Sequence, residues 1–554
     1  MRSIKIISTL TAFMIATLLI PANLSSRLSA HAQDVEAQAV AGDLDTTFGN
    51  GGKVTTSFPG FQGAFGYVMA LQPDGKIVVA GEVESDTADD FGVSRYNTDG
   101  SLDSTFGIAG RVTTDFFGFR EFAKSVAIQN DGKILVGGSC KTSGSDASFD
   151  FALARYNTDG SLDTGFGSGG KVSLDLGGNA EELLNTILVQ FDGRIVVVGG
   201  TLLGCCTNGF HTGLARFNPN GSLDTSFGLG GKVVSTLVNP QKAAFAAGGR
   251  ILVAGSIGLT SAPGSGDFGM ARFNSDGSLD TNFGSSGIVS TDFFGHRDDA
   301  LDVIFQADGK IVLAGTCATA DDSFHQDFGL ARYSAEGVPA TTFGNVGKVT
   351  TDFGGTQDRA VSVVQYTGGR IVAGGWTEGQ TSTTRDFALV QYQPDGTLDS
   401  TFGAGGKVIT GFSNGSVDAM STIAATPDGR AFVAAGSTNI SIAVARYVAL
   451  GEPPNFSISF ERSPITVDRG TTVKVHVLIN RSGGFSGNVT VTPPDASGLG
   501  VKFKPPFDIP TTEDSVIFKL KIKGSAIPGP HQLTASARDD AGRTATATLT
   551  LLIQ

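Results

Sequence analysis

Cysteine and tryptophan are scarce, with four cysteines and one tryptophan among 554 residues. Four cysteines are too few for a fold that depends on disulfides, and their spacing matches no zinc site. The adjacent Cys205 and Cys206 can form a strained vicinal disulfide, or one of them can pair with Cys140. The spacing does not decide between these pairings and free thiols.

Apolar runs long enough to cross a membrane are also missing, apart from one short run near the start. Arg2 and Lys5 precede an apolar run over residues 6–20, and small residues follow at Ala30 and Ala32. This order is typical of a secretory signal peptide, with a signal anchor as the alternative. We predict a signal peptide over residues 1–32 and a linker over 33–41. The mature protein would be secreted or on the cell surface, without an integral membrane span.

Positive charge is deficient in the body of the chain. The net charge is −13, and residues 1–32 and 453–554 each carry +3, which leaves −19 on residues 33–452. A body with that charge repels a phosphate backbone. We therefore predict no nucleic-acid partner.

Helical periodicity is absent over residues 42–450, and an internal repeat is found there. A Phe-Gly pair recurs at intervals of 56 to 61 residues, and each copy ends in an Arg-Tyr-like pair. Seven openings and seven endings define seven whole units over residues 42–447. The phenylalanines of the pairs are Phe48, Phe106, Phe166, Phe227, Phe283, Phe343 and Phe402.

Each unit has the pattern of four antiparallel strands. The second unit contains "GRVTTDFF", "AKSVAIQNDGKILVGG" and "DFALARYN" in succession, and its Asn-Asp-Gly step is a hairpin turn signal. One four-stranded sheet cannot bury both of its faces, but seven sheets packed radially can. We predict an all-β fold with a seven-bladed β-propeller over residues 42–450. An open β-solenoid is the alternative.

The repeated segments "GSLDSTFG", "DGKIVVAG" and "DFALARYN" resemble the delta-60 repeat, a repeat family of exported bacterial proteins. The resemblance covers about three quarters of the chain. It implies a repeat domain of secreted or surface proteins. It implies no agreed activity and no catalytic residues.

The composition changes after a short linker over residues 451–454. Residues 455–554 lack the repeat and contain alternating segments such as "TTVKVHVLIN" and "DSVIFKLKIK". About seven short strands in 100 residues are typical of an Ig-like β-sandwich. The segment resembles the Ig-like modules of bacterial surface proteins and secreted enzymes, which implies a spacer or adhesive unit.

The motif "NTDGSLD" over residues 97–103 recurs between units and has some features of a calcium loop. However, Arg95 occupies the position of the first ligand, and no distal glutamate follows. A turn built from Asx and Gly residues is the favoured interpretation, and calcium stays the weaker alternative.

Six units begin with an aspartate in the Leu-Asp pair and end with an arginine. The exception begins with Ala340 in place of the aspartate and ends with Gln391 in place of the arginine. Because burying one charge alone is costly, we predict an ion pair within each unit. Two of these predicted structural pairs are Asp103 with Arg155 and Asp163 with Arg216.

Ligand binding is expected where the copies disagree. Successive loops of an up-and-down blade alternate between two faces, so the variable loops share the face opposite the Asp-Gly turns. The candidate ligand-binding residues on this face are Trp376, His296, Asp298, Asp299, Asp321, Asp322 and His325. The His and Asp residues are candidates for metal binding or acid/base work, and Trp376 for stacking on a sugar or peptide.

No catalytic motif is recognisable, and the function expected from the sequence is binding or scaffolding without catalysis. The propeller would present its variable loops to an extracellular glycan or protein, without a cofactor and as a monomer. An extracellular propeller enzyme, a lyase or a glycosidase, is the second interpretation. A calcium-dependent adhesin is the third.

Overall fold

The computed structural model describes residues 40–554 except 145–147, 178–179, 203–210, 259–265, 321–324, 380–383, 414, 450–454, 462, 483–488, 493–495, 497–498, 503–506, 510–514 and 540–543. The predicted signal peptide, the pair Cys205 and Cys206, and the linker over 451–454 lie outside the described residues. Cys140 and Cys317 are buried free thiols. In the described part of the chain, no helix has the length and apolar character needed to cross a membrane.

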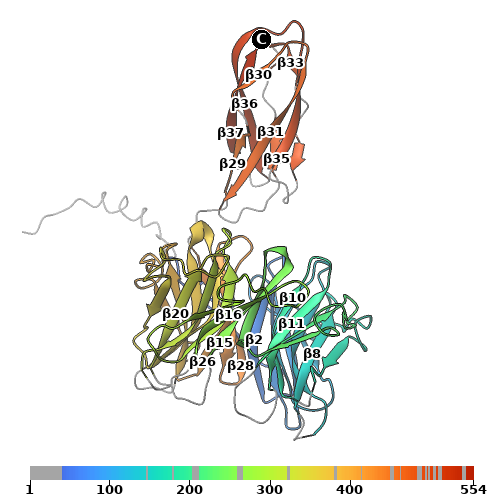
Figure 1. Ribbon diagram of the computed structural model, residues 1–554, viewed down its shortest axis with the longest axis vertical. Helices are drawn as coiled ribbons and strands as arrows, with labels where there is room; N and C mark the ends of the chain where they lie inside the picture. Colours follow the sequence, from blue (N-terminus) through green and yellow to red (C-terminus); the bar gives the residue numbers. More distant parts are fainter. Residues whose placement is uncertain are drawn as a thin grey trace, which may run out of the picture. The chain divides into compact units, whose positions relative to one another are not determined.

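Seven four-stranded antiparallel blades confirm the predicted propeller (Figure 1). Blades one to three are β2 (Gly63–Leu71), β3 (Ile77–Glu84), β4 (Asp89–Tyr96), β5 (Arg111–Thr114); β6 (Glu121–Ile128), β7 (Ile134–Lys141), β8 (Phe149–Tyr156), β9 (Lys171–Leu174); and β10 (Glu182–Val189), β11 (Ile195–Thr201), β12 (His211–Phe217), β13 (Lys232–Ser235). Blades four and five are β14 (Asn239–Ala246), β15 (Arg250–Ile257), β16 (Asp267–Phe273), β17 (Ile288–Thr291); and β18 (Asp298–Phe305), β19 (Ile311–Ala318), β20 (Gln326–Tyr333), β21 (Lys348–Thr351). Blade six is β22 (Gln357–Gln365), β23 (Ile371–Glu378), β24 (Arg385–Tyr392) and β25 (Lys407–Thr410).

Blade seven is made from both ends of the propeller. It consists of β26 (Asp418–Ala425), β27 (Ala431–Thr438), β28 (Ser441–Val448) and the first strand, β1 (Lys53–Thr56). Lys53 pairs with Ala445 and Thr56 with Ile442 in an antiparallel ladder. The first strand of the chain therefore closes the ring.

The blade is offset by one strand from the repeat unit of the sequence. The "GRV" strand that opens the second unit is β5, and it pairs with β4 of the preceding unit. Each unit therefore gives its first strand to the blade before it. This exchange ties neighbouring units together and leaves β1 to complete the last blade.

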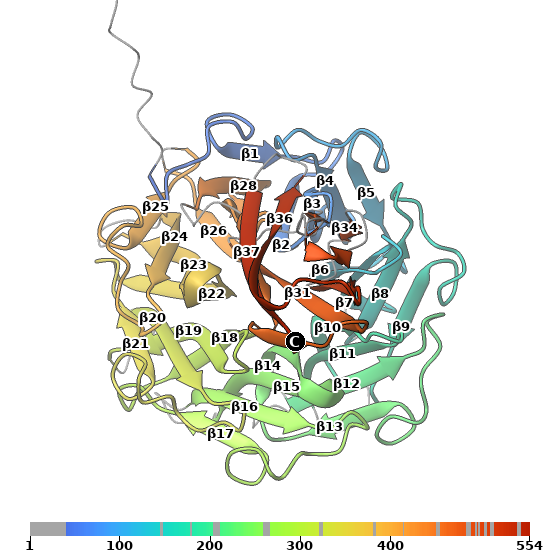
Figure 2. The ribbon, with the colours of Figure 1, turned by 90° about the horizontal axis from the view of Figure 1, so that it is seen from above.

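The first strand of every blade lies nearest the centre of the ring (Figure 2). These strands lie side by side in succession, and β26 lies beside β2, so the ring is closed. Each one contains a β-bulge where its register shifts by one residue. The unpaired residues at the bulges are Tyr67, Lys124, Asn185, Gln241, Leu301, Val361 and Ser421.

The repeated aromatic residues form the cores between blades. All seven phenylalanines of the Phe-Gly pairs have no exposed surface. Where the pair ends in tyrosine, the ring is also buried. In four units its hydroxyl bonds to a threonine on the outer strand of the preceding blade, as Tyr96 does with Thr56 at 2.8 Å. The copied Phe-Gly position accounts for seven of the 39 phenylalanines.

The repeated charges form ion pairs, but the pairing predicted within each unit is wrong. Arg95 Nε donates to Asp103 at 2.8 Å, and Arg155 Nε donates to Asp163 at 2.8 Å. Each arginine pairs with the aspartate eight residues later because both belong to one blade, on either side of the turn after its third strand. The remaining described pairs are Arg216 with Asp224, Arg272 with Asp280 and Arg446 with Asp45.

Each of these pairs also joins two blades. Beyond Asp103, Arg95 donates to the backbone oxygen of Thr158 in the next blade at 2.6 Å and stacks over Phe106. Lys76, which follows the Asp-Gly turn, adds a second cation at 3.0 Å from Asp103. Arg95 and Asp103 are both buried, so the loss of either partner would leave an uncompensated buried charge.

The "NTDGSLD" motif forms the favoured turn. Asp99 Oδ1 accepts hydrogen bonds from the amide and the hydroxyl of Ser101. Asp103 Oδ2 accepts hydrogen bonds from Arg95 and Lys76. The turn glycine has positive φ, and a Cβ at Gly160 would lie 2.8 Å from the amide nitrogen of Gly107 in the adjacent turn. Glycine is required where these turns meet, and the motif is scaffold.

The sixth unit offers a gain-of-stability test. Arg332 is buried but faces Ala340, and its Nε has no hydrogen-bond partner in the described structure. Ala340→Asp should supply the missing carboxylate to Arg332 and stabilise the propeller by about 1–3 kcal/mol, measured by denaturant unfolding. The control Asn345→Asp adds the same charge in the same connection. Equal stability of wild type and Ala340→Asp would contradict the pairing of each arginine with the residue eight positions later.

A two-sheet sandwich forms the second part of the described chain. One sheet has the order β29 (Asn455–Phe460), β31 (Thr472–Ser482), β35 (Ser515–Ile522), β33 (Val501–Lys502). The other has the order β30 (Ile465–Val467), β37 (Thr544–Ile553), β36 (Gly529–Asp539), β32 (Val489–Thr492), β34 (Phe507–Ile509). Its core contains Val477, Phe518, Leu533 and Leu549. The sandwich agrees with the expected class, and its Ig-like relationship stays a prediction.

Candidate functional site

The two faces of the propeller differ in the way the sequence predicts. The Asp-Gly turns and the turns after each third strand share one face, which we call the constant face. The loops after the second and fourth strands of each blade share the other, which we call the variable face. In blade one these are residues 85–88 and 115–120. Antiparallel pairing of all four strands requires this alternation.

The predicted cluster of His and Asp residues does not form as one group. Asp298 and Asp299 begin β18 and point to opposite sides of the strand, because successive strand residues alternate. Asp298 has no exposed surface and lies beside Asp267 and Asp292. Asp299 instead pairs with Arg297 at 3.0 Å and accepts the hydroxyl of Ser256.

The two histidines of the predicted cluster lie in separate loops. His296 is half-buried before β18, and His325 is exposed before β20. The backbone oxygen of His325 accepts the amide of Thr319 at 2.9 Å. Asp321 and Asp322 lie outside the described residues.

Trp376 does not offer an exposed stacking surface. Its side chain is 7% exposed, and the guanidinium of Arg385 lies 4.1 Å from the ring centroid. The position on the second strand of blade six places the indole inside the blade. The ring packs against Arg385, and the predicted contact of Trp376 with a ligand stays a prediction.

The structure brings together a polar group that the sequence did not indicate, on the strands nearest the centre. Tyr67, at the bulge of β2, donates its hydroxyl to Glu82 at 2.8 Å. Arg120 donates to the same carboxylate at 3.2 Å and pairs with Asp89 at 3.1 Å. Burial, followed by the charge of Glu82, raises the pKa of Tyr67, so this hydroxyl stays protonated.

Two cations of this group, Lys124 and Arg359, have no ion-pair partner among the described residues. Lys124 occupies the bulge of β6, with its ammonium 3.6 Å from the ring centroid of Tyr67. Burial lowers the pKa of Lys124 to about 8, opposed by Glu82 and assisted by the positive charge of Arg359. Burial also lowers the pKa of Arg359, and Asp299 opposes that shift.

The electrostatic interaction between Lys124 and Arg359 spans two blades that are not neighbours in the ring. Lys124 belongs to blade two and Arg359 to blade six, and both lie on innermost strands. The charge of one acts on the other because the ring brings these strands around a common centre (Figure 2). We call Tyr67, Glu82, Arg120, Lys124 and Arg359 the central cluster.

The central cluster can recognise an anion. Lys124 and Arg359 supply positive charge in partly buried positions, where a counter-charge is screened less than in open solvent. Tyr67 supplies an aromatic face, and Arg120 is also exposed beside a hollow of about 290 Å³ lined by residues 85–89, Phe119 and Lys141. Carboxylate, sulfate and phosphate groups are the chemical classes that match this set.

The sequence does indicate part of the central cluster, through residues that differ between copies inside the innermost strands and not in the loops. Comparison of the seven bulge residues shows lysine once and tyrosine once, among amides, apolar residues and serine. Variation inside a repeated strand is as informative as variation in a loop. Comparison of the loops does not reveal the central cluster, because its residues lie in strands and the position and direction of each bulge depend on strand register.

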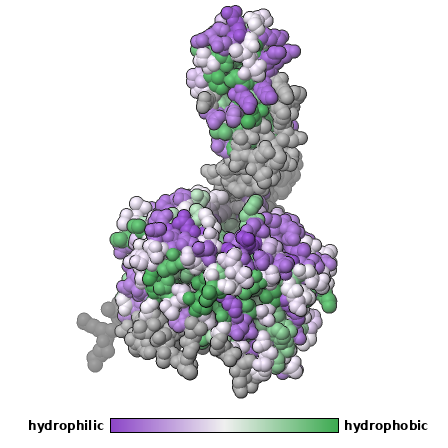
Figure 3. All heavy atoms as spheres, turned by 45° about the vertical axis from the view of Figure 1, so that its right-hand side comes forward, coloured by the Kyte–Doolittle hydropathy of each residue, from purple (hydrophilic) through white to green (hydrophobic). Residues whose placement is uncertain are grey.

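Other hollows occur along the rim between blades. One of about 560 Å³ is lined by Phe58, Phe61 and Ile108, and another by Leu176, Leu229 and Val234. These sets occupy equivalent positions in different blades, so the hollows result from the repeat. Figure 3 shows hydrophobic and hydrophilic side chains interspersed on one side of the propeller.

A comparison with protein families agrees with the propeller fold. Six stretches match a family described as a domain of unknown function (DUF5122) beta-propeller, over residues 72–106, 129–166, 190–227, 249–283, 306–343 and 369–402. A comparison with curated proteins gave no match. Among solved structures, sucrose-6-phosphate hydrolase from Lactobacillus gasseri has 9% sequence identity and a TM-score of 0.28, covering 67% of this chain and 86% of that chain. Six stretches of the propeller are therefore similar to the repeats of a β-propeller family.

Proposed function

We propose that this protein is an exported binding protein whose propeller holds an anionic extracellular glycan or protein ligand at the centre of its variable face. The observation that carries the proposal is the pair of cations Lys124 and Arg359, which have no ion-pair partner in the described structure although residues 33–452 carry a net charge of −19. Leaving two partly buried cations unpaired is costly. An anionic ligand would offset that cost.

Export is part of this proposal and is supported by the sequence. Arg2, Lys5 and the apolar run over residues 6–20 precede small residues at Ala30 and Ala32. Mature protein recovered outside the producing cells should begin at Gln33, as read by N-terminal mass spectrometry. An intact N-terminus on protein retained in the cytoplasm would contradict export.

The ligand proposal is tested on a glycan and peptide array with the chain from residue 33 onward. Carboxylated and sulfated glycans or acidic peptides should bind, and neutral ones should not. Lys124→Gln combined with Arg359→Gln should weaken binding at least tenfold, whereas Lys519→Gln, on an exposed strand position of the sandwich, should not. Binding should also fall as the pH rises above about 8, because Lys124 then loses its charge. Binding that is unchanged both in the Lys124→Gln, Arg359→Gln double variant and above about pH 8 would reject the central cluster as the binding site.

An extracellular lyase or glycosidase is the second candidate function. The observation that favours it is the lowered pKa of Lys124, close to Tyr67, since a lysine near neutrality can transfer protons. Array ligands incubated with the protein would then shorten, as followed by size-exclusion chromatography. Ligands that bind and keep their length would support binding without catalysis.

A further inference from the structure

Four groups of three carboxylates lie on the variable face, each at the joint between two blades. The first residue of a group begins the third strand of a blade, the second follows its fourth strand, and the third begins the next blade. In each group, one carboxylate oxygen of every residue lies within 4.8 Å of those of the other two. The groups are Asp90, Asp115, Glu121; Asp150, Asp175, Glu182; Asp267, Asp292, Asp298; and Asp327, Asp352, Asp358.

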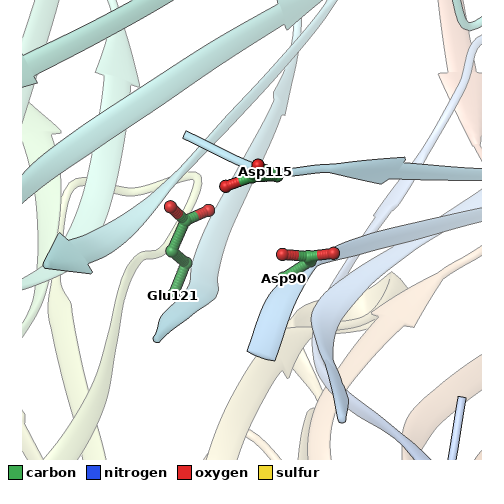
Figure 4. A group of neighbouring side chains, drawn as sticks. All are labelled: Asp90, Asp115 and Glu121. Carbon is green, nitrogen blue, oxygen red and sulfur yellow. The ribbon is translucent and has the colours of Figure 1, made fainter. Parts of the chain in front are cut away.

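Figure 4 shows the first group, in which Asp90, Asp115 and Glu121 come from separate segments and turn their carboxylates toward one another. None of the twelve carboxylates forms an ion pair with a lysine or arginine in the described part of the chain. A lysine of the neighbouring blade does approach each group, as Lys348 does. Its ammonium binds the backbone oxygen of Asp292 at 2.8 Å, so one positive charge faces three negative ones.

Two other joints of the ring form without such a group. At the joint between blades three and four the equivalent residues are His211, Thr236 and Val238. At the joint that closes the ring they are Ser441, Ser57 and Ala64. Blades pack at these joints without a single carboxylate in the group. Because like charges brought together oppose folding, the four acidic groups call for another cause.

Asp298 supplies an independent sign of a missing partner. Its side chain has no exposed surface, and its Oδ2 accepts the amide of Phe293 at 2.8 Å. Its Oδ1 is enclosed and has no hydrogen-bond partner among the described residues. Burial raises the pKa of Asp298 to about 7. A buried oxygen without a partner is costly, and the carboxylates of Asp267 and Asp292 beside it add to the cost.

Asp418 shows the same feature at the corresponding position of blade seven. It is fully buried, its Oδ2 accepts the amide of Phe412 at 2.7 Å, and its Oδ1 has no partner among the described residues. Here the middle position is Gly411, so the group retains only Asp386 and Asp418. An enclosed carboxylate oxygen without a partner is thus found at both Asp298 and Asp418. The full group of three carboxylates is present only around Asp298 of these two.

We propose that Asp267, Asp292 and Asp298 bind a divalent cation of the Ca²⁺ type, and that the three equivalent acidic groups are further sites of the same kind. Each of the three residues keeps a carboxylate oxygen beyond those used by Ser290, the amide of Gly295 and the amide of Phe293. An all-oxygen set of hard ligands suits Ca²⁺ or Mg²⁺ and not Zn²⁺. This site is distinct from the turn at residues 97–103 and does not depend on the proposed function.

Ca²⁺ is preferred over Mg²⁺ because of its coordination. Ca²⁺ accepts about six to eight oxygen ligands in a flexible geometry, which suits carboxylates from three separate segments, whereas Mg²⁺ demands a near-ideal octahedron.

The experiment is a calorimetric titration of chelator-treated full-length protein with CaCl2, MgCl2 and ZnCl2, alongside thermal unfolding. Wild type should bind Ca²⁺ more tightly than Mg²⁺ and should unfold at a higher temperature with Ca²⁺. Asp292→Asn should remove one class of binding sites. The set Asp115→Asn, Asp175→Asn, Asp292→Asn and Asp352→Asn, all at exposed positions, should remove at least nine tenths of the Ca²⁺ response.

Two further variants separate binding from folding. Asp308→Asn removes the same charge from a turn on the constant face and should keep the full Ca²⁺ response. Asp298→Asn should be at least as stable as wild type without Ca²⁺, because it removes a buried charge, and should lose its share of the Ca²⁺ response. Absence of Ca²⁺ binding by wild type at about 10 mM, roughly ten times the weakest dissociation constant usual for extracellular sites, or an unchanged response in Asp292→Asn and Asp298→Asn, would overturn the proposal.

Discussion

Replacing Asp103 with alanine should destabilise the propeller by about 3–5 kcal/mol, the usual cost of removing one partner of a buried ion pair. Arg95 is 4% exposed, and its Nε donates to Asp103 at 2.8 Å. Without Asp103 this guanidinium stays buried over Phe106 and cannot reach water. Denaturant unfolding of the variant and of wild type measures the difference in the free energy of unfolding.

A double-mutant cycle identifies the partner of Asp103. The chain already contains a version of this contact without the buried arginine, in which Gln391 donates to Asp399 at 2.8 Å and Arg370 supplies the positive charge at 3.0 Å. Adding Arg95→Gln to Asp103→Ala should therefore recover much of the lost stability, because no buried charge remains unpaired. Adding Arg155→Gln should instead cause a further loss, because Arg155 pairs with Asp163. If the variant with Arg155→Gln were the more stable of the two double variants, Asp103 would pair with Arg155, as predicted from the sequence unit.

Deleting residues 1–57 should abolish cooperative folding of the propeller. The deletion removes β1, so β28 loses its ladder partner and blade seven keeps three strands. Arg446 also loses Asp45. Together these losses are comparable to the whole stability of a domain, about 5–15 kcal/mol. Calorimetry should show no sharp unfolding transition, and amide exchange should be fast in β26, β27 and β28.

The control for this deletion is removal of residues 455–554. The hydrophobic cores of the propeller contain residues between Ala41 and Ala449, and those of the sandwich contain residues between Ile458 and Ile553. The C-terminal deletion should therefore leave the propeller transition in place. A synthetic peptide of residues 40–57 should restore part of the transition to the N-terminal deletion. A propeller that unfolds at the same temperature with and without β1 would show that closure contributes little.

Much of the scaffold is predictable from local pattern. The Asp-Gly turns, the alternating strands and the recurring Phe48-type positions predict four-stranded units, seven copies and a radial arrangement, and the structure confirms each of them. The assignment of loops to two faces also holds, because it follows from antiparallel pairing alone. These features depend on short-range periodicity that each copy repeats.

The partners of charged residues were predicted less well. Asp103 and Arg155 lie in one sequence unit, yet Asp103 pairs with Arg95 of the unit before. The error arises because sequence similarity marks the repeat length and not the point at which one sheet ends. Asp298 and Asp299 were expected to act together, but the strand sends one to the blade joint and the other toward Arg297.

Local periodicity and comparison of the copies are enough to predict the strand content, the sevenfold repeat, the C-terminal sandwich and the distinction between constant and variable loops. The folded ring was needed to find the offset of one strand, the closure by β1 and the meeting of Lys124 with Arg359. It also decided that Asp267, Asp292 and Asp298 share one joint. The physical reason is that these contacts join residues of different blades, and their distances depend on the register, the bulges and the closure of the ring, which no single copy encodes.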